Sequence, residues 1–208
     1  MTATARPLRS DAERNLRSIR AAALAVLSER GTEVGMEEIA QRAGVGVGTL
    51  YRRFANKDAL VDELMRAIFD DIVSAADAAL ERTDATGLAT FLAAVGGSLT
   101  DHQGCAQELL RAAATPEQSA ALRTRIGALT ERAHDTGEIA PHIAAGDVYT
   151  VMWGLRGVVE ATTHVAPRAW ERYLELQLAG LRAAEEPTHR RTLSRAQLAA
   201  VSSRRTQA

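Results

Sequence analysis

Residues 36–54, MEEIAQRAGVGVGTLYRRF, predict two short helices joined by a tight turn. Ile39, Ala40 and Ala43 recur at helical spacing and therefore share one face of the first helix, Met36–Ala43. Gly44 suits the turn, because glycine readily adopts a positive φ. The first of the two helices is thus amphipathic and ends at the glycine.

The second helix, Val47–Phe54, places Leu50 and Phe54 four residues apart and hence on one face. Its polar side chains point elsewhere, and they are Thr49, Tyr51, Arg52 and Arg53. A helix, a glycine turn and a second helix with exposed donors form a helix-turn-helix motif. An ordinary corner between two helices is the alternative interpretation.

The stretch GVGVGTLYRRFANKDAL, residues 44–60, resembles the signature of the TetR/AcrR family of transcriptional regulators. The matching residues are Ile39, Ala40, Ala43, Gly44, Val45, Gly48, Thr49, Leu50, Tyr51, Phe54, Lys57 and Leu60. The resemblance extends over about Asp11 to Leu64. The sequence departs from the family pattern at Gly35 and Gly46, where the family often has a hydroxyl residue, so neither position offers a hydroxyl to a phosphate.

Composition predicts an all-α protein. Hydrophobic residues make up 46% of the 208 residues and aromatic residues only 4%, with five prolines and no alternating β-branched runs. The net charge is −1, but residues 1–57 carry ten basic against six acidic side chains, and the remaining residues carry fifteen against twenty. A basic N-terminal part on an acidic remainder is typical of a DNA-binding regulator, although a solvated Arg-rich helix also explains it.

We expect three parts: a three-helix helix-turn-helix domain at 10–56, a helical-bundle ligand-binding and dimerisation domain at 57–184, and a mobile polar tail at 185–208. Ser10 with Glu13 predicts a capping box at the start of the first helix, and Asn56 predicts the cap of a long fourth helix. Further expected helices are Lys57–Arg82, Thr86–Asp101, Gln103–Ala114, Pro116–Asp135, Gly146–His164 and Pro167–Ala184.

A recognition helix meets base edges with its N-terminal residues and phosphates with its flanks. The predicted DNA-contacting residues are Arg42, Gly46, Val47, Gly48, Thr49, Tyr51, Arg52, Arg53 and Lys57. The resemblance implies backbone contacts for the residues at Tyr51 and Lys57. Arg6 and Arg9 either enter a minor groove or belong to a disordered end.

The resemblance also implies a homodimer built from the last two long helices. The apolar faces expected there comprise Val148, Val151, Leu155, Val158 and Val159 on one helix and Trp170, Leu174, Leu178 and Leu181 on the next. The alternative is that these faces belong to the core of a single chain. A symmetric dimer predicts a near-palindromic, double-stranded DNA operator.

By the same resemblance, the intervening helices enclose a cavity for a small-molecule effector. The candidate lining residues are Phe91, Val95, His102, Cys105, Arg111, Trp153 and Arg156. Phe91 and Val95 are equally consistent with plain core, and Arg156 with an i, i+4 pair to Glu160. The sequence does not identify the effector.

Other classes of function find little support. The five histidines form no metal-ligand pattern, no nucleophile elbow or phosphate-binding loop is present, and no cofactor is expected. The N-terminus lacks the apolar core of a signal peptide, and the apolar stretch 85–100 is short for a membrane span. Cys105 is the single cysteine, which rules out a disulfide within the chain and is compatible with a reducing cytoplasm. We therefore expect a cytoplasmic, ligand-responsive, homodimeric repressor. The alternative is a binding or protein-interaction module that retains the helix-turn-helix shape without specific DNA binding.

Overall fold

A computed structural model describes residues 6–102, 115–183 and 191–204, and this part of the chain forms nine α-helices, one 3-10 helix and no strand. The elements are α1 (Arg6–Arg30), η1 (Gly31–Glu33), α2 (Met36–Ala43), α3 (Val47–Arg53), α4 (Lys57–Leu80), α5 (Gly87–Asp101), α7 (Pro116–Asp135), α8 (Ala145–Thr162), α9 (Ala169–Ala183) and α10 (Arg195–Arg204). The prediction of an all-α fold is confirmed.

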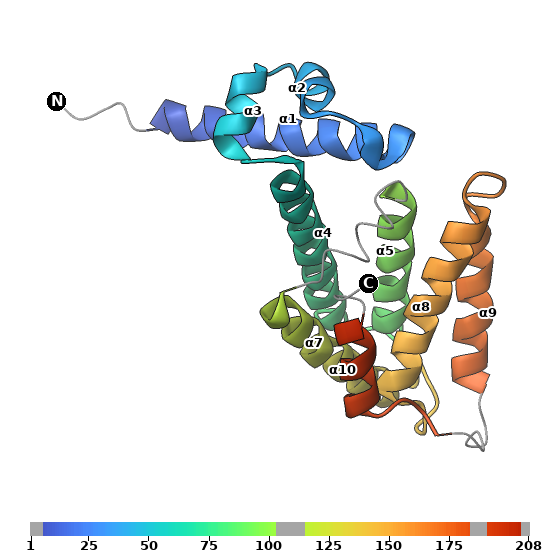
Figure 1. The fold of residues 1–208 in the computed structure, drawn as a ribbon. Helices are drawn as coiled ribbons and strands as arrows, with labels where there is room; N and C mark the ends of the chain where they lie inside the picture. Colours follow the sequence, from blue (N-terminus) through green and yellow to red (C-terminus); the bar gives the residue numbers. More distant parts are fainter. Residues whose placement is uncertain (1–5, 103–114, 184–190, 205–208) are drawn as a thin grey trace.

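Helices α1, α2 and α3, which we call the head, lie across the first turns of α4 (Figure 1). Helix α4 then runs away from the head into a bundle of α5, α7, α8 and α9, which we call the body. Helix α10 overlaps the lower part of the body in this view. A single long helix therefore connects the two parts.

The buried apolar side chains form two clusters, and α4 contributes to both. Its first half supplies Leu60, Leu64 and Ile68 to the head core, while Ala76 and Ala79 belong to the body core. Ile72, which is partly buried, packs against both clusters. The start of α4 at Lys57 therefore does not coincide with the end of the head core.

Most helix ends lie within two residues of their predicted positions. The Asn56 side chain accepts a hydrogen bond from the backbone N–H of Ala59 at 2.8 Å, which confirms the predicted cap of α4. The predicted start of α1 at Ser10 is wrong, since the helix already begins at Arg6 with Pro7 in its first turn, where proline is tolerated. The expected helix Gln103–Ala114 lies outside the described residues.

The apolar faces that we expected at a dimer interface lie in the core of the single chain. Val148, Val151, Leu155 and Leu174 are buried in the body core, and Trp170, Leu178 and Leu181 are partly buried against it, while Val159 is buried outside that cluster. Gly96 explains part of this arrangement, because a Cβ there would lie 2.3 Å from the Trp170 ring. The glycine leaves space on α5 for an aromatic side chain of α9, so the interpretation of these faces as core holds.

The polar C-terminal segment contains the short helix α10. Ser194 and Gln197 cap its start reciprocally, with N–H to side-chain distances of 2.9 and 3.3 Å. Leu198 is buried, and a Cβ on Gly146 at the start of α8 would lie 2.4 Å from the Thr192 hydroxyl. Part of the segment expected to be mobile thus packs against the body.

Candidate nucleic-acid interface

The turn between α2 and α3 is closed by backbone hydrogen bonds around Gly44. This residue has a φ of 69° and donates its N–H to the Gln41 carbonyl at 3.2 Å, while the Val45 N–H reaches the Ala40 carbonyl at 3.0 Å. These two bonds form a Schellman motif, which ends a helix and redirects the chain. Gly46 then precedes α3 in an extended conformation, without a side-chain cap.

Helix α3 is fixed by two apolar anchors. Leu50 is fully buried and Phe54 is 5% exposed, both in the head core. The rest of the helix faces outward, with Val47 41% and Tyr51 46% exposed and with Gly48, Arg52 and Arg53 also exposed. Arg52 donates to the Thr49 hydroxyl at 3.0 Å. The helix therefore presents small residues at its N-terminus and donors beyond them.

The remaining predicted DNA contacts lie beside α3. Arg42, in the last turn of α2, forms an ion pair with Glu29 of α1 at 2.7 Å, and both side chains are about half exposed. A second pair, Arg30 with Glu38 at 2.5 Å, also joins α1 to α2. Lys57 is the first residue of α4 and is half-buried.

The predicted effector residues are distributed over α5 and α8. Phe91 is fully buried and Val95 is 4% exposed, both in the body core. His102 follows α5, and burial lowers the pKa of its imidazole. Cys105 and Arg111 lie outside the described residues.

On α8, Trp153 and Arg156 are both half-buried. The Trp153 ring lies 6.3 Å from the Tyr149 ring, centre to centre, and burial raises the pKa of Tyr149 to about 12. Arg156 pairs with Glu160 at 3.5 Å, the i, i+4 contact that the sequence left open. Its Nε is buried and has no hydrogen-bond partner among the described residues.

A buried carboxylate that the sequence did not reveal supports the start of α5. Glu138 is 3% exposed and accepts hydrogen bonds from the backbone N–H groups of Leu88, at 3.0 Å, and Ala89, at 2.7 Å. These are the second and third residues of α5, the positions that a capping side chain normally satisfies. Thr86, directly before α5, makes no such bond. The cap therefore comes from a residue about fifty positions away.

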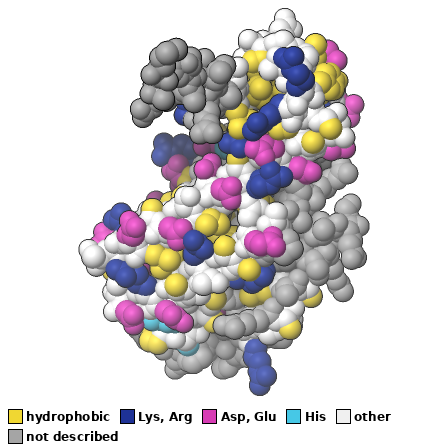
Figure 2. Space-filling view, turned by 90° about the vertical axis from the view of Figure 1, so that its left-hand side faces the viewer, with side chains coloured by type: hydrophobic (Ala, Val, Ile, Leu, Met, Phe, Trp, Pro, Cys, Tyr) yellow, Lys and Arg dark blue, Asp and Glu magenta, His cyan; other side chains and the backbone are white. Residues whose placement is uncertain are grey.

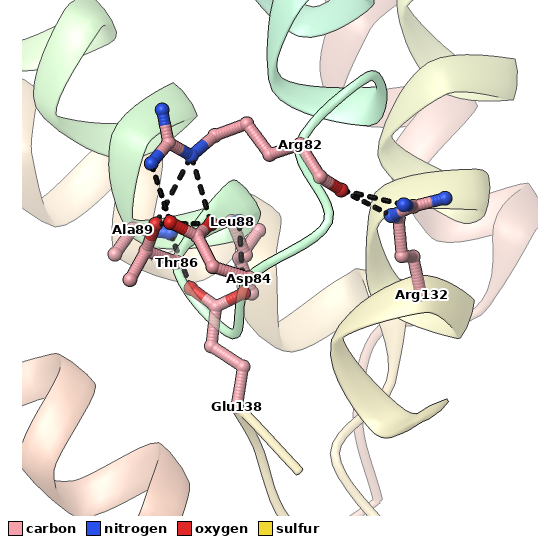
Figure 3. A network of polar contacts seen from close by, with 7 residues as sticks. All are labelled: Arg82, Asp84, Thr86, Leu88, Ala89, Arg132 and Glu138. Carbon is pink, nitrogen blue, oxygen red and sulfur yellow. Dashed lines mark hydrogen bonds and ion pairs between the residues drawn. The ribbon is translucent and has the colours of Figure 1, made fainter. Parts of the chain in front are cut away.

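The neighbouring turn between α4 and α5 is also held by polar contacts (Figure 3). The Arg82 guanidinium donates to Asp84 and to the Thr86 hydroxyl, and this arginine lowers the pKa of Asp84. The Arg82 carbonyl in turn accepts from the guanidinium of Arg132 on α7, with the Nε at 2.9 Å. Three helices are thereby joined at one corner of the body.

We expect Glu138→Ala to lower the free energy of unfolding by about 2–3 kcal/mol, because it leaves two backbone N–H groups of α5 without an acceptor. Urea denaturation followed by circular dichroism measures this loss. Glu131→Ala, which removes an exposed carboxylate from α7, serves as the matched control. Equal losses in the two variants would contradict a capping role for Glu138.

Comparisons with known protein families agree with this geometry. Residues 19–64 match the family described as bacterial regulatory proteins, tetR family. Residues 83–183 match the C-terminal domain of SbtR-like transcriptional regulators.

The chain belongs to the TetR family of transcriptional regulators. This family consists of DNA-binding transcriptional regulators and is non-enzymatic. This TetR-family chain is 38% identical over 77 residues to the HTH-type transcriptional repressor KstR2 of Mycobacterium tuberculosis, an alignment that covers 33% of this chain and 38% of that repressor. The chain thus spans little more than a third of the length of this curated relative.

Solved TetR-family structures extend the similarity to most of the chain. A regulator from Mycobacterium vanbaalenii is 27% identical with a TM-score of 0.67, covering 85% of this chain and 100% of its own. A regulator from Streptomyces coelicolor is 29% identical with a TM-score of 0.64, covering 80% and 98%. In the described part of this TetR-family chain, no helix combines the length and hydrophobicity of a membrane span, and no group of His, Cys, Asp and Glu is placed to hold a metal.

Proposed function

We propose that this TetR-family regulator is a homodimeric, sequence-specific repressor that leaves a near-palindromic operator when a small molecule binds its body. The observation that carries the proposal is the orientation of α3. Leu50 and Phe54 anchor the helix in the head core, while its opposite side is exposed and ends in arginines. This is the geometry that a recognition helix needs in a major groove.

The exposed residues of α3 divide into two proposed roles. Gly46, Val47, Gly48 and Thr49, at its N-terminal end, approach the base edges through methyl groups, a hydroxyl and backbone. Tyr51, Arg52, Arg53 and Lys57 donate to phosphate oxygens, which fixes the register of the protein on the duplex. Arg42 reaches a phosphate from the end of α2 by exchanging its Glu29 partner for the DNA backbone.

The proposed dimer uses the outer faces of α8 and α9 and not their core faces. Small or apolar residues form two stripes there: Trp153, Gly157 and Ala161 on α8, and Leu176, Ala179, Gly180 and Ala183 on α9. Leu176 is 54% exposed in the single chain. Small residues let helices approach closely, so two copies of these faces favour a four-helix contact. The two-fold symmetry of such a pair requires a near-palindromic site.

We assign effector binding to the body, and DNA binding to the head together with the first half of α4, which completes the head core. The proposed effector residues on α8 are Trp153 and Arg156, joined by His102 at the end of α5, while Phe91 and Val95 lie in the body core. An effector changes operator affinity only if it binds the DNA-free state more tightly than the DNA-bound state. A cytoplasmic location follows from this role.

We expect Leu176→Asp to weaken self-association at least about tenfold, because an unpaired carboxylate would be buried at the interface. Sedimentation velocity over a range of protein concentrations measures the shift. Ala120→Asp adds the same charge to an exposed position of α7 and should leave association unchanged. A wild-type chain that stays monomeric at micromolar concentration would refute the dimer itself.

Selection of random-sequence DNA by the purified full chain tests the proposed function as a whole. At physiological salt, we expect enrichment of one near-palindrome with two half-sites about one or two helical turns apart. No enrichment by a folded dimer would refute specific DNA recognition. The chain would then be better described as a binding module that retains the helix-turn-helix shape.

A further inference from the structure

A row of polar side chains on α7 contacts α4 at regular intervals. Gln118, Arg125 and Arg132 are spaced seven residues apart, so they follow one side of the helix with little drift. Each of the three donates hydrogen bonds to α4 or to the turn that follows it. We call these three residues the polar row.

The contacts of the polar row have a consistent register. Gln118 Nε2 lies 2.8 Å from Asp70 Oδ1 and 3.1 Å from the Arg66 carbonyl. Arg125 binds both carboxylate oxygens of Asp77, at 2.7 and 2.8 Å, and lowers the pKa of that carboxyl. Residue numbers rise together on the two helices, so α4 and α7 run in the same direction. Sliding one helix past the other would break all of these contacts.

Apolar packing lies alongside the polar row. Leu122, Ile126, Leu129 and Ala133 of α7 are buried in the same cluster as Ala76 and Ala79 of α4. This apolar contact supplies the cohesion between the helices.

Acidic and basic side chains are intermixed on the side of the molecule seen in Figure 2. Because the Asp77 side chain is 51% exposed, its pair with Arg125 adds little stability.

The two ends of α4 are held by different parts of the molecule. Near its start, Glu63 forms ion pairs with Arg20 of α1 and with Arg66, and Leu60 and Leu64 lie in the head core. Just beyond its end, the Arg82 carbonyl accepts from Arg132 of the polar row (Figure 3). One continuous helix therefore joins the contacts with α7 to the head core.

We propose that the polar row fixes the register in which α7 packs on α4, and that Asp77 and Arg125 are positioning residues that set the orientation of the reading head from outside the DNA interface. This proposal rests on the proposed function, because it gives the route by which an event in the body changes operator affinity. The head then follows α7 and not α4 alone.

A charge exchange tests the proposal in the full-length chain. Arg125→Asp and Asp77→Arg each break the central pair, and the double variant restores it with the charges reversed. Arg123→Asp, an exposed neighbour on α7, makes the same change of charge outside the row and is the matched control. Circular dichroism verifies the fold of each variant, and the milder Arg125→Gln replaces Arg125→Asp if that variant does not fold.

The first measurement is the distance between spin labels at Ala55, which is exposed beside the head, and Val165, which is 90% exposed in the body, in samples mixed with an excess of unlabelled chain so that distances within one protomer dominate. The labels are attached to cysteines in a chain whose native Cys105 is replaced by serine. We expect a narrow distance distribution in the wild type, a broader one in each single variant, and a narrow one again in the double variant. A distribution in Arg125→Asp that matches that of Arg123→Asp would overturn the proposal.

The second measurement is affinity for the DNA selected by the wild-type chain. We expect each single variant to bind about two- to thirty-fold more weakly, the usual range for residues that couple distant sites, and the double variant to recover most of the loss. Folded single variants with unchanged affinity would overturn the positioning role. If the wild type selects no DNA, the proposed function fails, while the distance measurement still decides whether the polar row holds the two helices together.

Discussion

Gly48→Asp is expected to abolish operator binding while leaving the head folded. We expect a loss of at least about 100-fold in affinity, because a carboxylate at the N-terminal end of α3 would face the DNA, and like charges at an interface cost several kcal/mol. The head tolerates the side chain, since Gly48 is exposed and a Cβ there meets no atom within 4 Å. An acidic residue in the first turn of a helix also interacts favourably with its dipole.

Binding measured by fluorescence anisotropy, with thermal unfolding of the same samples, tests this expectation. The stability should be unchanged or raised by up to about 1 kcal/mol, because glycine is a poor helix former. Gly48→Ala is the matched control, since it adds the Cβ without the charge. A Gly48→Asp variant that binds the operator as tightly as Gly48→Ala would remove the start of α3 from the DNA interface.

Phe91→Ala is expected to destabilise the protein by about 3–5 kcal/mol, the usual cost of truncating a fully buried phenylalanine. Phe91 has no exposed surface and lies among buried side chains of the body core. Its removal therefore leaves a cavity that a close-packed interior does not refill. Denaturation with urea, monitored by far-ultraviolet circular dichroism, measures the loss.

The size of the Phe91 effect also bears on effector binding. A residue that lines an open cavity has fewer packing partners, so a loss below about 2 kcal/mol would indicate that Phe91 faces such a space. Val165→Ala, at a position that is 90% exposed, should change stability by less than about 0.5 kcal/mol and controls for truncation itself. A loss in the full range would identify Phe91 as structural core.

The helix-turn-helix could be predicted in detail because its determinants are local. Helical spacing identified Leu50 and Phe54 as anchors, and Gly44 adopts the positive φ expected of it. Asn56 caps α4 through a residue only three positions away. Patterns of this kind depend on a few neighbouring residues, and a single sequence contains all of them.

Contacts between distant residues could not be predicted in the same way. Periodicity showed that Val148, Val151 and Leu155 share an apolar face, but it does not say whether that face meets the same chain or another one. Glu138 caps α5 from about fifty residues away, and no spacing rule connects it with Leu88. The polar row on α7 was missed for the same reason, since its partners lie on α4.

The sharing of α4 between two cores restricts how a head could be exchanged between related regulators. An exchange at the loop before Lys57 would separate the head from Leu60, Leu64 and Ile68, which complete its core. An exchange point beside Ile72 would keep each set of buried side chains with its own partners. The exchange point that suits hybrid regulators with new operator specificity therefore lies inside α4, about four turns after its first residue.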